Sequence, residues 1–232
     1  MADALHHRGP DMGGQWTDTP SGLALAFRRL AIIDLTPSGH QPMLSANGRF
    51  AIVYNGEVYN YQELRQQLLD DGCRFLGTSD TEVILEAFVH WGIETTVKRL
   101  IGMFAIALWD CKARRLWLLR DRLGIKPLYF GSVDDRFFFA SELKALRAVN
   151  DWRPEVDRDA VAGFLRFNYI PAPHSIYRNV FKLPPGSMLS LRPGEDPAVA
   201  RYWTMADVIR QERTEVTDEW AIGAAEGLMR DA

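Results

Sequence analysis

Apolar and polar positions along the chain alternate in a way that predicts short strands and helices in groups. The most apolar run, residues 50–54, is rich in β-branched and aromatic residues and is followed by Asn55-Gly56-Glu57. We expect this run to form a buried central strand that ends at Asn55-Gly56-Glu57, where the chain turns into a helix. Asn-Gly after a strand is ordinarily a turn signal. A carboxamide beside a glycine can equally supply two donors to an oxygen that gains negative charge.

Two helices are predicted after the central strand, each with a start and a stop in the sequence. Residues 60–63 resemble a capping box, and Gly72 ends the first helix. Residues 79–82 form the second cap, and Gly92 ends the second helix. Further elements are expected as strands at 15–17, 23–27, 103–109, 116–120, 128–130 and 137–140, and as helices at 142–148 and from Asp157 or Asp159 to Phe167. Mostly antiparallel strands interleaved with helical pairs indicate an α+β fold.

Composition and charge exclude several classes of partner. The chain has 232 residues, 47% of them hydrophobic, and a formal net charge of −3, which gives no reason to expect a nucleic acid or an anionic membrane. No apolar run approaches the ~18 residues of a membrane span, and the first residues lack the apolar core of a secretory signal. Cys73 and Cys111 lack the spacing of a disulfide scaffold or a zinc site. We therefore expect a cytoplasmic protein without a bound metal.

The character of the chain changes after Trp203. Residues 204–232 are charged and helix-like, and they hold too few apolar residues for a core of their own. We expect one domain over residues 1–203, followed by a linker and the first helix of another domain over residues 204–232.

Two charged residues, Arg29 and Asp80, are candidates for binding a small zwitterion. Taken alone, Arg29 is also typical of a surface salt bridge, and Asp80 of a plain helix N-cap. The planar fork of an arginine suits a carboxylate, and an aspartate suits an ammonium group.

Eight sequence runs occur in the order found in one family. The chain resembles the N-terminal glutaminase domain of glutamine-hydrolysing asparagine synthetase, a class II glutamine amidotransferase, over residues 1–203. The runs that carry this resemblance are residues 7–11 (HRGPD), 28–34 (RRLAIID), 40–43 (HQPM), 54–57 (YNGE), 79–82 (SDTE), 102–105 (GMFA), 120–129 (RDRLGIKPLY) and 140–146 (ASELKAL).

The resemblance implies a four-layer αββα sandwich of the N-terminal-nucleophile hydrolase type. In this family an N-terminal cysteine attacks the carboxamide of glutamine, with its own α-amino group as base. Ammonia then passes to a second domain, where ATP and Mg²⁺ serve to activate aspartate. The implied partners are glutamine and the synthetase domain of the same full-length chain, and the family often forms homodimers.

The resemblance also assigns roles to individual residues. Asn55 and Gly56 would form the oxyanion hole, and Arg29 would bind the α-carboxylate of glutamine. Asp80 would bind the substrate ammonium, with Glu57 nearby. The backbone around three apolar residues would line the pocket; these are Leu30, Ile32 and Ile33.

Two departures from the family pattern bear on activity. Only six residues precede His7, where the family has the strand that carries the nucleophilic cysteine, and the sequence stops before the loop that binds pyrophosphate. Neither Cys73 nor Cys111 has a free α-amine. We therefore expect a gene fragment or a start assigned too late, with first strands missing, a glutamine pocket without its nucleophile, and no ATP site. A smaller departure is Phe27, where the family commonly has His.

Two alternatives remain open from the sequence. One is a non-catalytic module that binds glutamine or pairs with another subunit. The other is a related amidotransferase that acts on another carboxylate, because glucosamine-phosphate synthase, phosphoribosyl-pyrophosphate amidotransferase and glutamate synthase share the glutaminase fold. The runs at residues 40–43 and 120–129 favour the asparagine synthetase group.

Overall fold

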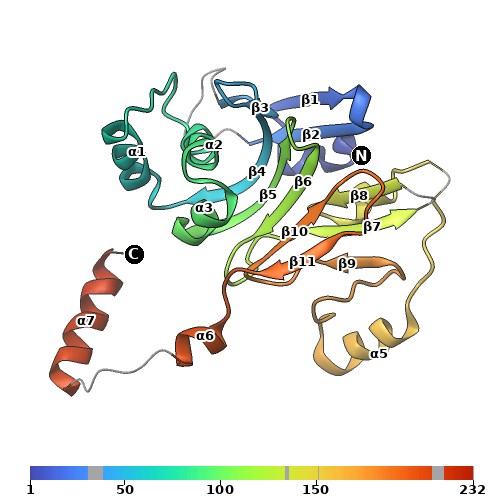
Figure 1. Ribbon diagram of the computed structural model, residues 1–232. Helices are drawn as coiled ribbons and strands as arrows, with labels where there is room; N and C mark the ends of the chain where they lie inside the picture. The colour runs from blue at the N-terminus through green and yellow to red at the C-terminus, as the bar shows by residue number, and fades with distance from the viewer. Residues whose placement is uncertain (31–38, 134–135, 151, 211–216, 232) are drawn as a thin grey trace.

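The computed structural model describes residues 1–30, 39–133, 136–150, 152–210 and 217–231 (Figure 1). The strands are β1 Met12–Asp18, β2 Leu23–Arg29, β3 Met43–Leu44, β4 Phe50–Val58, β5 Gly102–Asp110, β6 Arg115–Arg120, β7 Tyr129–Val133, β8 Arg136–Ala140, β9 Val180–Lys182, β10 Ser187–Leu191 and β11 Ala198–Arg201. The helices are the 3₁₀ turns η1 Ala2–Arg8 and η2 Thr19–Ser21, and α1 Tyr61–Asp70, α2 Asp80–Trp91, α3 Ile93–Arg99, α4 Leu143–Leu146, α5 Arg158–Phe167, α6 Met205–Arg210 and α7 Asp218–Asp231.

Antiparallel strands form three sheets. The largest has six strands in the order β11-β10-β6-β5-β4-β3, so β4 and β5 lie inside it. A three-stranded sheet, β8-β7-β9, and the β1–β2 pair make up the rest. Figure 1 shows α1, α2 and α3 on one side of the six-stranded sheet, and β7, β8 and β9 on the other side.

Alternation along β4 and β5 directs their side chains into two different cores. Phe50, Ile52 and Tyr54 pack with residues of α1, α2 and α3, whereas Ala51 and Val53 face the opposite side. The period of two follows from the pleat of a strand. Because both faces are buried, the strands appear in the sequence as nearly continuous apolar runs.

Two further layers complete the sandwich. Leu25 of β2 and Phe130 of β7 pack against the second face of the six-stranded sheet. Ala145 and Leu146 of α4 then cover the outer side of the three-stranded sheet, with Leu5 of η1 packed against the same cluster. The order is therefore helices, sheet, sheets, helices, which confirms the predicted α+β class and its αββα layering.

The end of the central strand was predicted wrongly. Asn55, Gly56 and Glu57 lie within β4, which continues to Val58 and pairs with β5 through its whole length. A Cβ on Gly56 would lie 2.1 Å from the Met103 carbonyl oxygen. The glycine is thus required by the close approach of two strands and not by a turn.

The helix starts were predicted with mixed success. Ser79 caps α2 by accepting a hydrogen bond from the Thr81 backbone N–H, as expected. The capping box at α1 is absent, because the Asn60 side chain instead bonds the Arg99 carbonyl and the Ile101 backbone N–H. Contacts distant in sequence therefore replace the local cap.

Most predicted strands and helices are present, with boundaries shifted by a few residues. The apolar pattern did not predict α3, β9, β10 or β11, among others. Cys73 lies between α1 and α2, and Cys111 follows β5 in the hairpin turn to β6.

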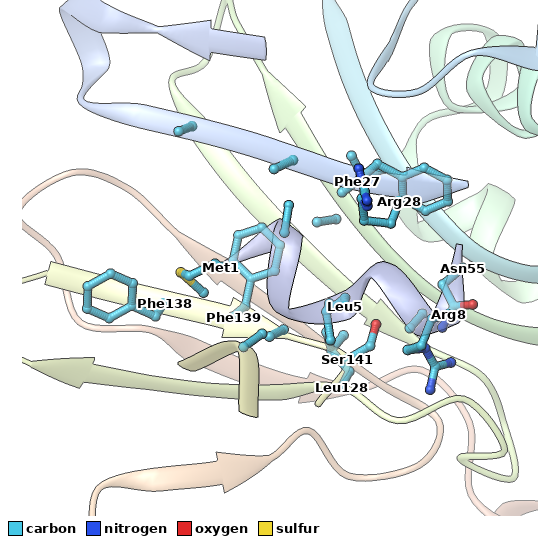
Figure 2. A pocket seen from close by; sticks show the side chains of 18 of the residues that line it. Met1, Leu5, Arg8, Phe27, Arg28, Asn55, Leu128, Phe138, Phe139 and Ser141 are labelled. Atoms are coloured by element: carbon cyan, nitrogen blue, oxygen red, sulfur yellow. The ribbon is translucent and has the colours of Figure 1, made fainter. Parts of the chain in front are cut away.

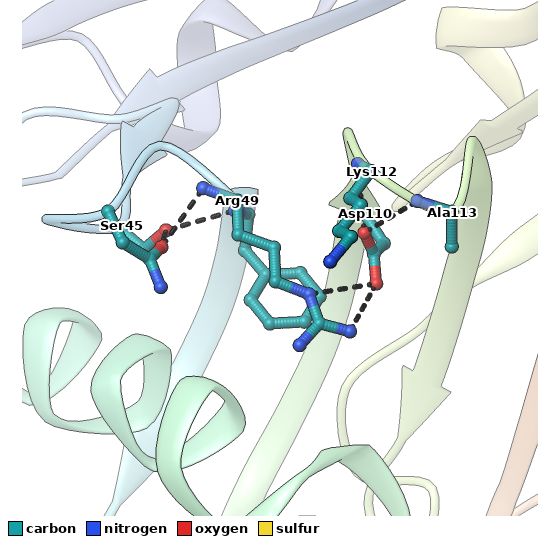
Figure 3. Close-up of polar contacts among 7 residues, drawn as sticks. Ser45, Arg49, Asp110, Lys112 and Ala113 are labelled. Atoms are coloured by element: carbon teal, nitrogen blue, oxygen red, sulfur yellow. Dashed lines mark hydrogen bonds and ion pairs between the residues drawn. The ribbon is translucent and has the colours of Figure 1, made fainter.

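Asp110 fastens the hairpin between β5 and β6 to the start of β4 (Figure 3). Its carboxylate accepts two hydrogen bonds from the Arg49 guanidinium, at 2.8 and 3.2 Å, and one each from the Lys112 and Ala113 backbone N–H groups. These donors hold the pKa of Asp110 below its ordinary value, against the effect of burial.

Replacing this carboxylate should destabilise the fold in a pH-dependent way. We expect Asp110→Ala to lower the free energy of unfolding by about 2 kcal/mol at pH 7, because a buried carboxylate loses its hydrogen bonds from Arg49, Lys112 and Ala113, whereas these exposed donors can bind water instead. Since the folded-state pKa is depressed, the contribution is fully present above the unfolded value of ~3.9 and disappears as the pH falls through the folded value. Urea unfolding of both proteins from pH 7 downward measures this difference. A difference that stayed constant into the acid range would contradict the assignment.

The C-terminal helices carry exposed apolar side chains. Figure 1 shows α7 standing apart from the layered body, and Trp220, Ile222 and Leu228 of this helix are exposed. None of the described helices is both long and apolar enough to cross a membrane.

Candidate functional site

Two neighbouring cavities meet at Asn55. The first, here called the core cavity, has a volume of about 390 Å³ and lies between β2, β8 and the six-stranded sheet. Figure 2 shows Asn55 and Arg8 at one end of it and Phe138 at the other. The second, the strand-end cavity, has a volume of about 250 Å³ and lies around residues 54–57 of β4. Five residues line both cavities: Arg8, Phe27, Arg28, Tyr54 and Asn55.

The two cavities differ in chemistry. The core cavity is walled largely by apolar side chains such as Val53, Leu128 and Phe139. The strand-end cavity holds charges of both signs within a small space, from Arg8, Arg28, Arg29, Glu57, Asp80 and Lys126. A zwitterionic ligand needs groups of both signs, and Asp3, Arg8 and Arg28 also bring both to the core cavity. The strand-end cavity alone adds the candidate residues Arg29, Glu57 and Asp80, so it is the candidate binding site although it is the smaller of the two.

Asp80 is the first residue of α2, and the residue is 7% exposed. The Tyr54 hydroxyl donates a hydrogen bond of 2.8 Å to its Oδ2 atom. Burial raises the pKa of Asp80 above its ordinary value, and the Tyr54 hydrogen bond opposes that rise. Because Ser79 is the N-cap, the plain explanation of Asp80 as a cap is wrong. Asp80 has no ion pair with any residue that the structure describes, and an ammonium group would supply one.

Asn55 and Gly56 each supply a hydrogen-bond donor near this cavity. The Asn55 donor is on its side chain, and the Gly56 donor is its backbone N–H at the edge of β4 that does not pair with β5. The Asn55 Nδ2 atom is buried and has no hydrogen-bond acceptor among the described residues. The Tyr54 backbone N–H points away from β5, because it donates to Gln41 Oε1 at 2.6 Å. Successive N–H groups alternate along a strand, so the Gly56 N–H points to the same edge as that of Tyr54. Both predicted oxyanion donors thus lie beside the strand-end cavity.

Arg29 ends β2 and lines the strand-end cavity. The residue is buried, so it does not lie on the surface. Leu30 is half exposed and lines the same cavity. Ile32 and Ile33 lie outside the described residues.

Glu57 places a second carboxylate in the strand-end cavity, and its charge contributes to the raised pKa of Asp80. Lys126 lines the cavity from the loop after β6. That loop is fixed by the buried Asp121 carboxylate, which accepts hydrogen bonds from the backbone N–H groups of Ile125 and Lys126. Residues 120–129 therefore also have a structural role, because Asp121 holds the loop that carries Lys126.

Sequence reasoning missed several residues that line the site. Tyr54 and Gln41 were treated only as parts of longer runs, yet both are buried against Asp80 and Thr81. Arg8 also lines the site, and its guanidinium donates to Glu142 Oε1 at 2.9 Å. The runs at residues 7–11 and 40–43 contained the signal, but only the fold shows what these side chains contact.

Neither cysteine of the chain lines either cavity. Cys73 Sγ lies 3.9 Å from His90 Nδ1, and His90 is paired on its other side with Asp71. Burial and the nearby carboxylates raise the pKa of the Cys73 thiol, which disfavours the reactive thiolate. This triad-like arrangement is therefore not an activated nucleophile.

Comparison with known families gives one match, to a family described as the glutamine amidotransferase domain, over residues 1–203.

Similar curated proteins are glutamine-hydrolysing asparagine synthetases. Asparagine synthetase 1 of Bacillus subtilis is 39% identical over 204 residues, which are 88% of this chain and 31% of that protein. A putative asparagine synthetase of Mycobacterium tuberculosis is 37% identical over 211 residues, 86% of this chain and 32% of that protein. Asparagine synthetase 3 of B. subtilis is 33% identical over 235 residues, 100% of this chain and 37% of that protein. The chain spans about a third of the length of these relatives.

Solved structures support the fold. Glutamine phosphoribosylpyrophosphate amidotransferase from B. subtilis aligns with a TM-score of 0.57 at 24% identity, over 78% of this chain and 35% of that chain. This likeness concerns the fold alone.

Proposed function

Because the chain belongs to the glutamine amidotransferase domain family, we propose that its strand-end cavity binds L-glutamine for amide-nitrogen transfer. In this proposal the chain is the glutaminase part of an asparagine synthetase. Asparagine synthetases that are 33–39% identical to it support the assignment. The observation that carries the proposal is the buried Asn55 Nδ2, which has no acceptor within the described part of the chain and lies beside a cavity that Arg29 and Asp80 also line.

Each end of glutamine has a matching group in the strand-end cavity. The Arg29 guanidinium binds the α-carboxylate, and Asp80 with Glu57 binds the ammonium group. The Asn55 side chain and the Gly56 N–H then face the carboxamide oxygen, on which charge develops when the carbonyl carbon is attacked. Donors that are fixed before the reaction stabilise that charge without reorganisation.

The remaining steps of amide transfer belong to groups outside this cavity. A thiol nucleophile would have to come from a residue other than Cys73 and Cys111, since neither lines a cavity. The synthetase domain of a longer protein would receive the ammonia, and ATP and Mg²⁺ would bind there and not in this chain. A homodimer of such full-length chains is part of the same proposal.

Calorimetric titration of residues 1–232 with L-glutamine tests the binding proposal. We expect saturable binding with a Kd in the range of roughly 1 µM to 1 mM that is usual for enzyme substrates. D-glutamine should bind at least about tenfold more weakly, because an inverted α-carbon cannot place both charged groups on Arg29 and Asp80. Absence of saturable L-glutamine binding, or equal affinity for the two enantiomers, would overturn the proposal.

The position of the two cysteines favours a second candidate function, a glutamine-binding module without hydrolysis. Ammonia release from L-glutamine by residues 1–232 separates the two. A module binds glutamine and releases no ammonia above the buffer rate. A rate above that background which disappears in Asn55→Ala would establish the glutaminase activity in this chain itself.

A further inference from the structure

Resting on the proposed glutamine site, we propose that Tyr54 is a positioning residue for the substrate ammonium. Its hydroxyl fixes one oxygen of the Asp80 carboxylate, so that the other oxygen is presented to the ammonium group. Gln41 holds this pair in place by linking β4 to the start of α2. Tyr54 thus acts through Asp80 and binds no part of the reacting carboxamide.

The contact between Tyr54 and Asp80 is buried and short. The Tyr54 side chain is 4% exposed, and its ring packs in the core between β4 and the helices. Its hydroxyl donates to Asp80 Oδ2 at 2.8 Å. The other oxygen, Oδ1, lies 3.5 Å from the Thr81 Oγ1 donor, and the backbone N–H groups of Thr81 and Val58 also act on the carboxylate, where they lower its pKa. Among the described residues, Tyr54 therefore makes the short side-chain hydrogen bond to this carboxylate, and it makes it to Oδ2 and not to Oδ1.

Gln41 connects the two elements that carry this pair. Its Oε1 atom accepts from the Tyr54 backbone N–H at 2.6 Å, and its Nε2 atom donates to Thr81 Oγ1 at 3.3 Å. The side chain is 6% exposed, so water does not compete strongly for either bond. Gln41 therefore fixes the distance between β4 and the start of α2. The same two bonds hold Tyr54 and Asp80 in contact.

The tyrosine donates permanently. Burial and the neighbouring Asp80 raise the pKa of Tyr54 far above its ordinary value, so the hydroxyl keeps its proton at every physiological pH. It can therefore serve Asp80 only as a donor, which favours the charged carboxylate that an ammonium requires. The other charged groups that line the cavity are Arg8, Arg28, Arg29, Glu57 and Lys126.

The test compares two ligands in one variant. Tyr54→Phe removes the hydroxyl and keeps the ring. L-glutamine carries the α-ammonium group, and glutaramate is the same chain without it. Ligand-observed NMR titration should show that Tyr54→Phe weakens L-glutamine binding by about tenfold, the usual effect of losing a hydrogen bond to a charged group. Glutaramate affinity should change by less than about twofold.

The pH dependence supplies an independent readout. Without the Tyr54 hydrogen bond, Asp80 should take up its proton at a higher pH. The pH at which L-glutamine affinity falls to half should therefore be higher in Tyr54→Phe than in the wild type. A residue that served only to fill the core would leave this midpoint unchanged.

Tyr202→Phe is the matched control. Tyr202 also donates a partly buried hydrogen bond, at 2.8 Å to the Arg120 carbonyl, but it lines neither cavity. It should leave the affinity for both ligands unchanged. If circular dichroism shows that Tyr54→Phe is unfolded, Gln41→Met serves instead. It removes the hydrogen bonds of Gln41 to both Tyr54 and Thr81, and it should show the same selective loss of affinity for L-glutamine.

The inference is overturned if Tyr54→Phe or Gln41→Met weakens both ligands equally, or leaves L-glutamine binding and its pH midpoint unchanged. Failure of the wild-type protein to bind L-glutamine would instead overturn the glutamine site itself. The two failures are thus distinguishable.

Discussion

An Asp80→Asn variant should lose L-glutamine binding by on the order of a hundredfold. The asparagine keeps the shape of the side chain, but it removes the negative charge that faces the substrate ammonium. Truncating one member of a desolvated, hydrogen-bonded charge pair typically costs 2–5 kcal/mol of binding free energy. A hundredfold loss of affinity lies near the lower end of this range. Calorimetric titration with L-glutamine measures the loss.

Stability should move in the opposite direction from binding in the same variant. Because burial raises the pKa of Asp80, the charged carboxylate costs stability at pH 7, and the wild-type protein gains stability as the pH falls through that raised pKa. Asp80→Asn should be at least as stable as the wild type at pH 7 and lack this pH dependence. Such trade-offs between stability and binding are common at functional sites.

Asp159→Asn is the matched control for the charge. Asp159 lies in the first turn of α5, away from both cavities, so the variant loses a carboxylate at an equivalent helix terminus. It should bind L-glutamine like the wild type. The account would be contradicted by an Asp80→Asn variant that bound L-glutamine with wild-type affinity, or by equal losses in the two variants.

A Gly56→Ala variant should be destabilised by about 3 kcal/mol or more, beyond the usual cost of overpacking a core. The added Cβ would lie 2.1 Å from the Met103 carbonyl oxygen and 2.7 Å from the Phe104 Cα atom. Both are backbone atoms of β5, so the two central strands would have to move apart. The displacement would also carry Asn55 away from its place beside the cavity.

Gly163→Ala is the control for this substitution. Gly163 lies inside α5, and an added Cβ there would meet no atom within 4 Å. Alanine should stabilise that helix by roughly 0.5–1 kcal/mol, because glycine loses more backbone entropy on folding. Urea unfolding of both variants compares them directly. Equal stability of Gly56→Ala and the wild type would show that the strands are farther apart than described.

The central part of the fold could be predicted from the sequence because its signals are strong and local. The apolar runs of β4 and β5 are buried on both faces, and the stripe of α2 begins at a serine that does cap it. The segment after α5 was not predicted, because short apolar runs such as residues 180–182 gain their strand conformation only by pairing with β7. Propensity is too weak to reveal such pairing.

The errors at Asn55 and Asn60 share a physical cause. Asn-Gly is a local turn signal, but pairing with β5 carries the chain straight through Gly56 to Val58. The Asn60 side chain likewise serves Arg99 and Ile101, distant in sequence, and not its own helix. In both cases tertiary contacts outweigh local preference.

The candidate site was predicted in part. The resemblance placed Asn55, Gly56, Glu57 and Asp80 around one pocket, and the fold brings all four to the strand-end cavity. Tyr54 was hidden because a tyrosine in an apolar strand is typical of a core residue. Its hydroxyl contact with Asp80, 26 residues away, appears only when β4 and α2 are packed together.

A crystal structure of residues 1–232 with L-glutamine tests the central claim most directly. The account predicts the ligand in the strand-end cavity, with its ammonium nitrogen about 3 Å from an Asp80 carboxylate oxygen and its α-carboxylate on Arg29. Its carboxamide oxygen should face Asn55 Nδ2 and the Gly56 N–H. Glutamine found in the core cavity, or in the strand-end cavity with its carboxamide on Asp80 and its ammonium group near Asn55, would contradict the account.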